Sequence, residues 1–315
     1  MNFDSMSSIS FDDAVKAADK IMTKKNPKLR RISKLMVSRK TRAYAYFCYY
    51  YFRWVDDYID SKFNSVDEKK IFFKNQSDLA QLLINGETVK LNFAEEYFLL
   101  YFIKFVLAQD SRLLVDSFTL LLGTLGDDIR RLENNGLFSE KEKQLYMNDN
   151  TESLFNITNF FLIPKSAFKY QNKFNCLRTL AHIFLITDFA EDFGSGYINI
   201  SNEEIRKYQL NAADLLNDNS LVTWYKDSFT KINKWLNEDT LILRKFPLKL
   251  KFFWFWLFPY CVHKMNRIKI YNYDPRKDVT RSAVKEIKIY SLTILSTFKF
   301  IYKIFLPSEF TTHFL

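Results

Sequence analysis

Residues 49–60 read YYYFRWVDDYID. Asp56 and Asp60 are four residues apart, so on a helix their carboxylates lie on one face, and Arg53 lies on that face one turn earlier. Like charges at this spacing destabilise a helix by roughly 0.2–0.5 kcal/mol, and burying them costs far more unless a cation neutralises them. The stretch therefore predicts a helix that carries either a solvated acidic face or a cation site.

The same spacing occurs a second time, in LITDFAEDFGSG at residues 185–196. Asp188 and Asp192 are again four residues apart, in an apolar helix expected to end at Gly194 or Gly196. One such pair alone is more often a solvated helix face, but two pairs in apolar surroundings favour a metal site. Mg²⁺ prefers one or two carboxylates together with waters and phosphate oxygens. The four aspartates therefore predict bound magnesium that bridges to a diphosphate.

Composition favours an all-α protein. Of 315 residues, 48% are hydrophobic, and only six are Gly and six Pro, too few for a turn-rich β protein. The aromatic share of 17% suggests that some rings line an apolar cavity or meet lipid. We expect one domain over 1–315, with an N-terminal extension at 1–27. The helical periodicity predicts helices at 11–22, 28–60, 67–86, 91–134, 139–162, 166–193, 202–216, 219–245, 249–271 and 278–304.

The formal charge of +10 fits a partner that carries phosphate, such as a diphosphate, an anionic membrane or nucleic acid. Nucleic acid is the weakest of the three, because the chain has no zinc-like Cys/His spacing and no nucleic-acid or Gly-rich phosphate motif. The three cysteines are far apart in apolar stretches and are expected to be reduced. With a polar, acidic N-terminus, these features predict a cytoplasmic protein.

The apolar tail at 288–315 and the segment FFWFWLFPYCVHKM are interrupted by Lys or His and are too short to span a membrane. Lys288, Lys299 and Lys303 among aromatic residues would let the tail lie on a membrane surface. A core helix with solvated lysines explains the same pattern equally well.

Taken together, these motifs resemble the squalene and phytoene synthase family, over roughly residues 28–290. The first signature of that family matches Tyr49, Arg53, Asp56 and Asp60. The second matches Asp188, Glu191, Asp192 and the following GYINI. Weaker similarities are Asp127 in LLGTLGDD, Tyr146 in QLYMND, Tyr260, and the basic pair Arg276 and Lys277.

The resemblance implies a single-domain isoprenoid synthase fold, with helices around a central apolar cavity, that joins two prenyl diphosphates head to head. The substrate would be farnesyl or geranylgeranyl diphosphate. Some members then reduce the product with NADPH, which this sequence does not itself indicate. The implied magnesium ligands are Asp56, Asp60, Asp188 and Asp192. Arg53, Tyr49 and Tyr260 would act at the leaving group, and Arg53, Arg276, Lys277 and Tyr146 would bind substrate.

The chain departs from the family pattern at several positions. Phe184 stands where the family has Asn, Glu152 where it has a glycine, and Asn199 where it has a tyrosine. The usual Ser-rich start is replaced by NPKLRRISKL, whose Lys28, Arg30 and Arg31 could take over diphosphate binding. These changes leave open a terpene synthase acting on one prenyl diphosphate and a catalytically silent binding or assembly protein.

Overall fold

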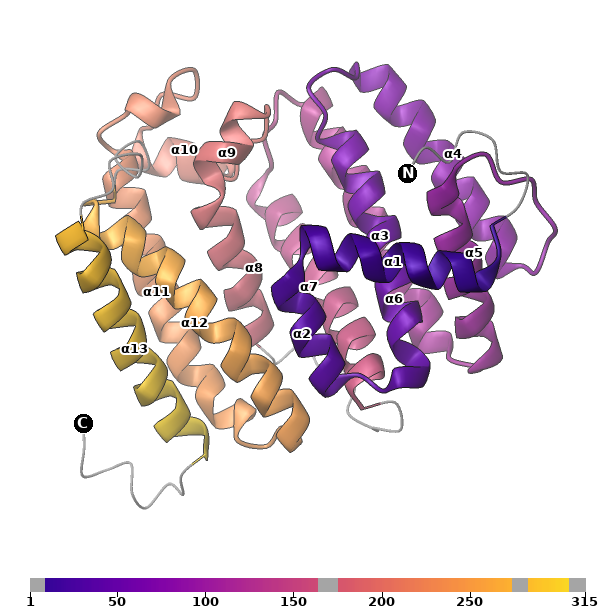
Figure 1. Cartoon of the computed structure of the whole chain (residues 1–315). Coiled ribbons are helices and arrows are strands. Elements are labelled where there is room, and N and C mark those ends of the chain that lie inside the picture. Colours follow the sequence, from indigo (N-terminus) through magenta and orange to yellow (C-terminus); the bar gives the residue numbers. More distant parts are fainter. Residues whose placement is uncertain (1–8, 164–174, 274–282, 306–315) are drawn as a thin grey trace. The chain divides into compact units, whose positions relative to one another are not determined.

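The computed structural model describes residues 9–163, 175–273 and 283–305, apart from the side chains of 175–178, 237–242, 283 and 303. The described part of the chain is all helical, with thirteen α-helices and one short 3-10 helix (Figure 1), which confirms the predicted fold class. The chain divides into two compact units, residues 1–133 with 152–169 and residues 134–151 with 170–315. One boundary between the units falls inside α7 (Glu140–Leu162), between Thr151 and Glu152. The expectations of one domain and of a central cavity stay predictions.

The first unit is built around α3, which packs against α1, α5 and α6. Phe47, Tyr51, Phe102 and Phe118 are fully buried there. Within 1–27, expected as an N-terminal extension, Phe11–Lys25 form α1, and its Ala14, Ala18 and Met22 are fully buried. The helices are α1 (Phe11–Lys25), α2 (Pro27–Met36), α3 (Arg39–Ile59), α4 (Val66–Ile84), α5 (Ala94–Ala108), α6 (Arg112–Glu133) and part of α7 (Glu140–Leu162).

The second unit has its core where α8 packs against α11 and α12, and α12 packs in turn against α13. Phe189, Trp224, Tyr225 and Phe229 are buried in it. Its elements after α7 are α8 (Asn175–Thr187), α9 (Phe189–Gly194), α10 (Asn202–Tyr208), the 3-10 helix η1 (Leu215–Asn217), α11 (Leu221–Leu243), α12 (Leu248–Ile270) and α13 (Ala283–Phe305).

Four of the helices that the sequence predicted as continuous are interrupted in the structure. The helix expected at 28–60 breaks at Ser38, whose side chain accepts a hydrogen bond from the Thr41 N–H and caps α3. The helix expected at 91–134 breaks at Asp110, which has a φ of 49°. The helix expected at 202–216 ends early, because Gln209, with a φ of 54°, terminates α10. The helix expected at 166–193 bends at Asp188, which separates α8 from α9.

No helix among the described residues is long and apolar enough to cross a membrane. Cys48 and Cys261 are free and buried, whereas the side chain of Cys176 lies outside the described part of the chain.

Candidate functional site

The first aspartate motif occupies the last turn of α3. The Asp60 N–H closes that turn on the Asp56 carbonyl oxygen at 2.8 Å. The guanidinium of Arg53 bonds both Asp56, at 3.0 Å, and Asp57, at 2.7 Å. Arg53, Asp56 and the C-cap residue Asp60 thus follow one another over the last two turns of α3.

The negative charge around Asp56 is greater than the positive charge of Arg53 offsets. Burial raises the pKa of Asp56 and the Asp60 carboxylate raises it further; Arg53 opposes them, and Asp128 adds to the increase, so that the pKa reaches about 7. The side chain of Asp56 is 31% exposed. A partly buried carboxylate that is under-compensated in this way fits a bound cation.

Two residues near this motif were missed by the sequence reasoning. Asp128 on α6, which is bonded to Arg131 at 2.9 Å, adds negative charge near Asp56. The adjacent Asp127, which the family resemblance indicated, is paired with Arg130. Lys69 on α4 is only 5% exposed; burial lowers its pKa and the Asp60 carboxylate opposes that decrease. Its surroundings in sequence, SVDEKK, give no sign that this lysine faces inward.

Two of the predicted tyrosines have specific contacts of their own. The Tyr49 hydroxyl accepts a hydrogen bond of 3.1 Å from Asn26 Nδ2, which links α3 to the junction of α1 and α2. Tyr146, in the second unit, packs its ring 5.4 Å from the ring of Phe138. Of the basic residues expected near the N-terminus, Arg30 makes two hydrogen bonds to Asp19, at 2.9 and 2.7 Å.

The second motif lies at a bend between two helices. Asp188 separates α8 from α9, although the Asp192 N–H still bonds the Asp188 carbonyl oxygen at 2.9 Å. The side-chain amide of Asn199 donates to Asp192 at 2.6 Å and to the Leu185 carbonyl at 2.9 Å. The residue that replaces a family tyrosine thus fixes the orientation of one of the two aspartates.

Asp188 is paired with a cation from a distant part of the chain. Lys264 Nζ on α12 donates to the Asp188 carboxylate. Burial lowers the pKa of Lys264, but its bond to Asp188 outweighs burial, and the net pKa is raised. The ammonium also lies 5.2 Å from the ring of Tyr260 and 5.7 Å from that of Phe184. Tyr260, Phe184 and Asp188 are therefore brought together around Lys264.

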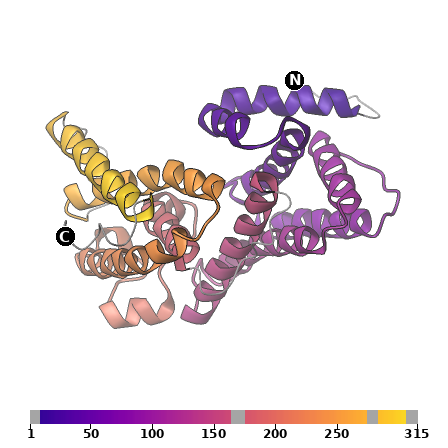
Figure 2. The same cartoon turned by 90° about the horizontal axis from the view of Figure 1, so that it is seen from below.

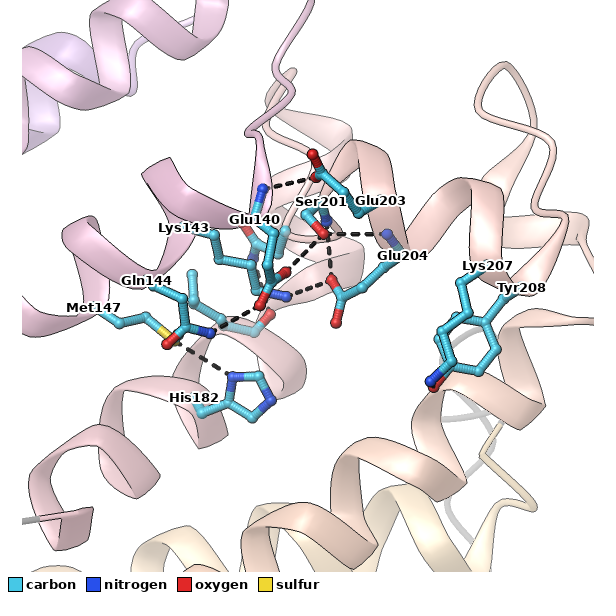
Figure 3. Close-up of polar contacts among 12 residues, drawn as sticks. Glu140, Lys143, Gln144, Met147, His182, Ser201, Glu203, Glu204, Lys207 and Tyr208 are labelled. Atoms are coloured by element: carbon cyan, nitrogen blue, oxygen red, sulfur yellow. Dashed lines mark hydrogen bonds and ion pairs between the residues drawn. The ribbon is translucent and has the colours of Figure 1, made fainter.

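A buried polar cluster holds the segment that follows the second motif (Figure 3). Lys143 of α7, 1% exposed, donates at 2.6 Å to Glu204 of α10. The Ser201 hydroxyl donates to Glu140 at 2.8 Å, and the Glu140 N–H donates to Glu203 at 2.7 Å. Burial tends to raise the pKa of Glu204, but the Lys143 ammonium outweighs it and lowers the pKa. The start of α7 is thereby joined to α10.

Gly136 fixes the same segment from the loop before α7. It has a φ of +78°, and a Cβ at this position would lie 2.0 Å from the Gly196 carbonyl oxygen. The Ile198 N–H bonds the Gly136 carbonyl at 2.9 Å. Only glycine allows this close approach, so Gly136 positions the turn directly after Asp192.

Each motif offers two carboxylates, the number that Mg²⁺ commonly takes from a protein. Within the described residues, no three or more His, Cys, Asp or Glu side chains are grouped so that they could hold a metal. A cavity of about 690 Å³ in the first unit, lined by α4, α5 and Tyr58, contains none of the predicted site residues. Arg276 and Lys277 lie outside the described residues.

No protein-family model matches this chain, and no curated protein sequence matches it. Among the solved structures that share its fold are two synthases. A dehydrosqualene synthase, solved in complex with a ligand, is 11% identical with a TM-score of 0.60, covering 91% of this chain and 98% of its own. Squalene synthase HpnC from Alicyclobacillus acidocaldarius is 11% identical with a TM-score of 0.55, covering 91% of this chain and 94% of its own.

Proposed function

We propose that this protein is a magnesium-dependent prenyltransferase that joins two prenyl diphosphates, farnesyl or geranylgeranyl diphosphate, head to head. The observation that carries the proposal is the arrangement at the end of α3, where the partly buried carboxylate of Asp56 is bonded to Arg53 and lies one turn before Asp60. The fold shared with a dehydrosqualene synthase and a squalene synthase supports it. Four aspartates at the two repeated spacings supply the ligands that Mg²⁺ prefers.

Asp56, Asp60, Asp188 and Asp192 would hold magnesium, which when bound offsets the negative charge that develops on a departing diphosphate. Arg53 offers a planar guanidinium suited to two phosphate oxygens, and its bonds to Asp56 and Asp57 orient it. Asn199 fixes the Asp192 carboxylate, so that less ordering is required on binding.

Lys264 gives the second motif a different character from the first. Its ammonium already offsets the charge of Asp188, so magnesium held by Asp188 and Asp192 would compete with Lys264 for that carboxylate. Lys264, beside the rings of Tyr260 and Phe184, would also be a donor for a phosphate oxygen. Aromatic ring faces attract a cation, so these two rings suit an allylic cation as well as the ammonium.

A terpene synthase that acts on one prenyl diphosphate is the second candidate. Phe184 favours it, because a phenyl ring stands where the family resemblance expects an amide, and the ring lies beside Tyr260 with centroids 6.3 Å apart. NADPH would be needed only if the head-to-head product is reduced.

The test is incubation of the purified protein with Mg²⁺ and farnesyl or geranylgeranyl diphosphate, with and without NADPH, followed by mass spectrometry of the products. A doubled carbon skeleton supports the proposal, and an undoubled hydrocarbon or alcohol supports the terpene synthase. No turnover with either substrate would point to the silent binding protein.

Two variants test the aspartates directly. Asp60→Ala and Asp188→Ala should abolish diphosphate release with the helical content unchanged. The matched control is Asp116→Ala on α6, whose side chain is 57% exposed and is paired with Arg112 of the same helix. Full activity in either motif variant would defeat the metal assignment.

A further inference from the structure

Helix α13 has one face in the core and one face in water. Ile289, Thr293, Phe300 and Ile304 are buried, at the spacing of one helix face, and pack on the rest of the second unit. The opposite face is apolar as well. Val284 is 76% exposed, Ile287 67%, and Phe298 66%. An amphipathic helix of a water-soluble core is expected to be polar on this side.

The exposed apolar surface continues onto α12, which lies beside α13 in both views (Figures 1 and 2). The ring of Phe252 is 5.9 Å from that of Phe305, and Phe252 is half exposed. Leu248, one turn earlier on α12, is 61% exposed. We call this surface the α12–α13 face; its members are Leu248, Phe252, Val284, Ile287, Ile294, Leu295, Phe298 and Phe305.

Positive charge flanks this face. Lys285, Lys288 and Lys299 are exposed on α13, next to the apolar stripe. Lys251 Nζ of α12 lies 5.8 Å from the ring of Phe305. The sequence of α12 contains no acidic residue, and that of α13 contains one, Glu286, which is partly buried and faces Arg267 at 3.9 Å. The face is thus apolar along its centre and basic at its edge.

We propose that the α12–α13 face docks on an anionic lipid bilayer, with α13 lying in the plane of the interface. Apolar side chains enter the boundary between headgroups and acyl chains, while the lysines extend to lipid phosphates. A two-fold dimer through the same face would set lysines against lysines without acidic partners, which disfavours a second copy of the chain as the occupant.

The proposal goes beyond the proposed function, because it needs neither the aspartates nor prenyl diphosphate.

The experiment is sedimentation of the full-length protein with phosphatidylcholine vesicles, with and without phosphatidylserine, at low and high salt and without substrate. We expect binding only to the anionic vesicles, weakened by salt. Leu295→Ser with Phe298→Ser should lower the partition coefficient about tenfold or more. Lys288→Gln with Lys299→Gln should lower it about fivefold for each lysine.

The matched control is Leu35→Ser with Phe63→Ser, which removes the same residue types at positions that are 83% and 97% exposed in the first unit. Circular dichroism would establish that all variants are folded, which is expected because every substituted position is exposed. Binding that the Leu295/Phe298 variant retains, or that the control loses equally, would overturn the proposal. Absence of vesicle binding would also overturn the proposal. Self-association through the face without vesicle binding, detected by analytical ultracentrifugation, would be one such outcome.

Discussion

Replacing Asp56 by asparagine should stabilise the metal-free protein at alkaline pH. Burial and the neighbouring carboxylates raise the pKa of Asp56 from 3.8 to about 7. The stability linked to this proton is therefore complete below about pH 3.8 and is lost as the pH rises through about 7. At about 1.4 kcal/mol per pKa unit, the charged carboxylate costs up to about 4 kcal/mol in the folded state. Because the side chain is 31% exposed, solvent screening reduces the expected cost to about 2 kcal/mol.

Asparagine keeps the shape of the neutral acid and cannot ionise. In urea unfolding with a chelator at about pH 8, the unfolding free energy of Asp56→Asn should exceed that of the wild type by about 2 kcal/mol. At about pH 5 this difference should fall below half of that value. Adding Mg²⁺ should then raise the unfolding free energy of the wild type but not of the variant, because a ligand stabilises only the state that binds it.

The control is Asp57→Asn, since Asp57 lies on the same helix, is 41% exposed and is bonded to Arg53. Its unfolding free energy should change by less than about 0.5 kcal/mol. A variant of Asp56 that is no more stable than the wild type at alkaline pH, or a gain that does not vary with pH, would refute the electrostatic reasoning. An equal response of both proteins to Mg²⁺ would refute the metal assignment alone.

Three further changes test other contacts. Lys264→Gln removes the ammonium that competes for Asp188, so calorimetry should show Mg²⁺ binding tightened about fivefold or more; unchanged affinity would mean that this aspartate is not a ligand. Gly136→Ala should lower the urea-unfolding free energy by about 2 kcal/mol or more, because of its positive φ and the Gly196 carbonyl, whereas Gly123→Ala, in open space on α6, should raise it by about 0.5–1 kcal/mol. Lys143→Met leaves a mostly buried carboxylate unpaired and should cost about 3–5 kcal/mol in the same assay; a smaller loss in a well-folded variant would show that water replaces the ion pair.

The sequence by itself predicted the helical class and the four-residue spacing of each aspartate pair. Both are local properties, because hydrophobic periodicity and a single turn of helix depend only on residues that are near one another in the chain. Helix breaks were harder to predict. The cap at Ser38 and the positive φ of Asp110 interrupt runs whose apolar pattern continues without a gap.

Only the tertiary structure decided which charges meet the aspartates. Lys264 is 76 residues from Asp188, and Lys69 and Asp128 reach the first motif from two other helices. Such pairings depend on how helices pack, which spacing within one helix does not encode. The two aspartate pairs look alike in sequence, yet the first has excess negative charge, whereas in the second Asp188 is paired with an ammonium and Asp192 accepts a hydrogen bond from an amide. The difference comes from the side chains that helix packing places around each pair.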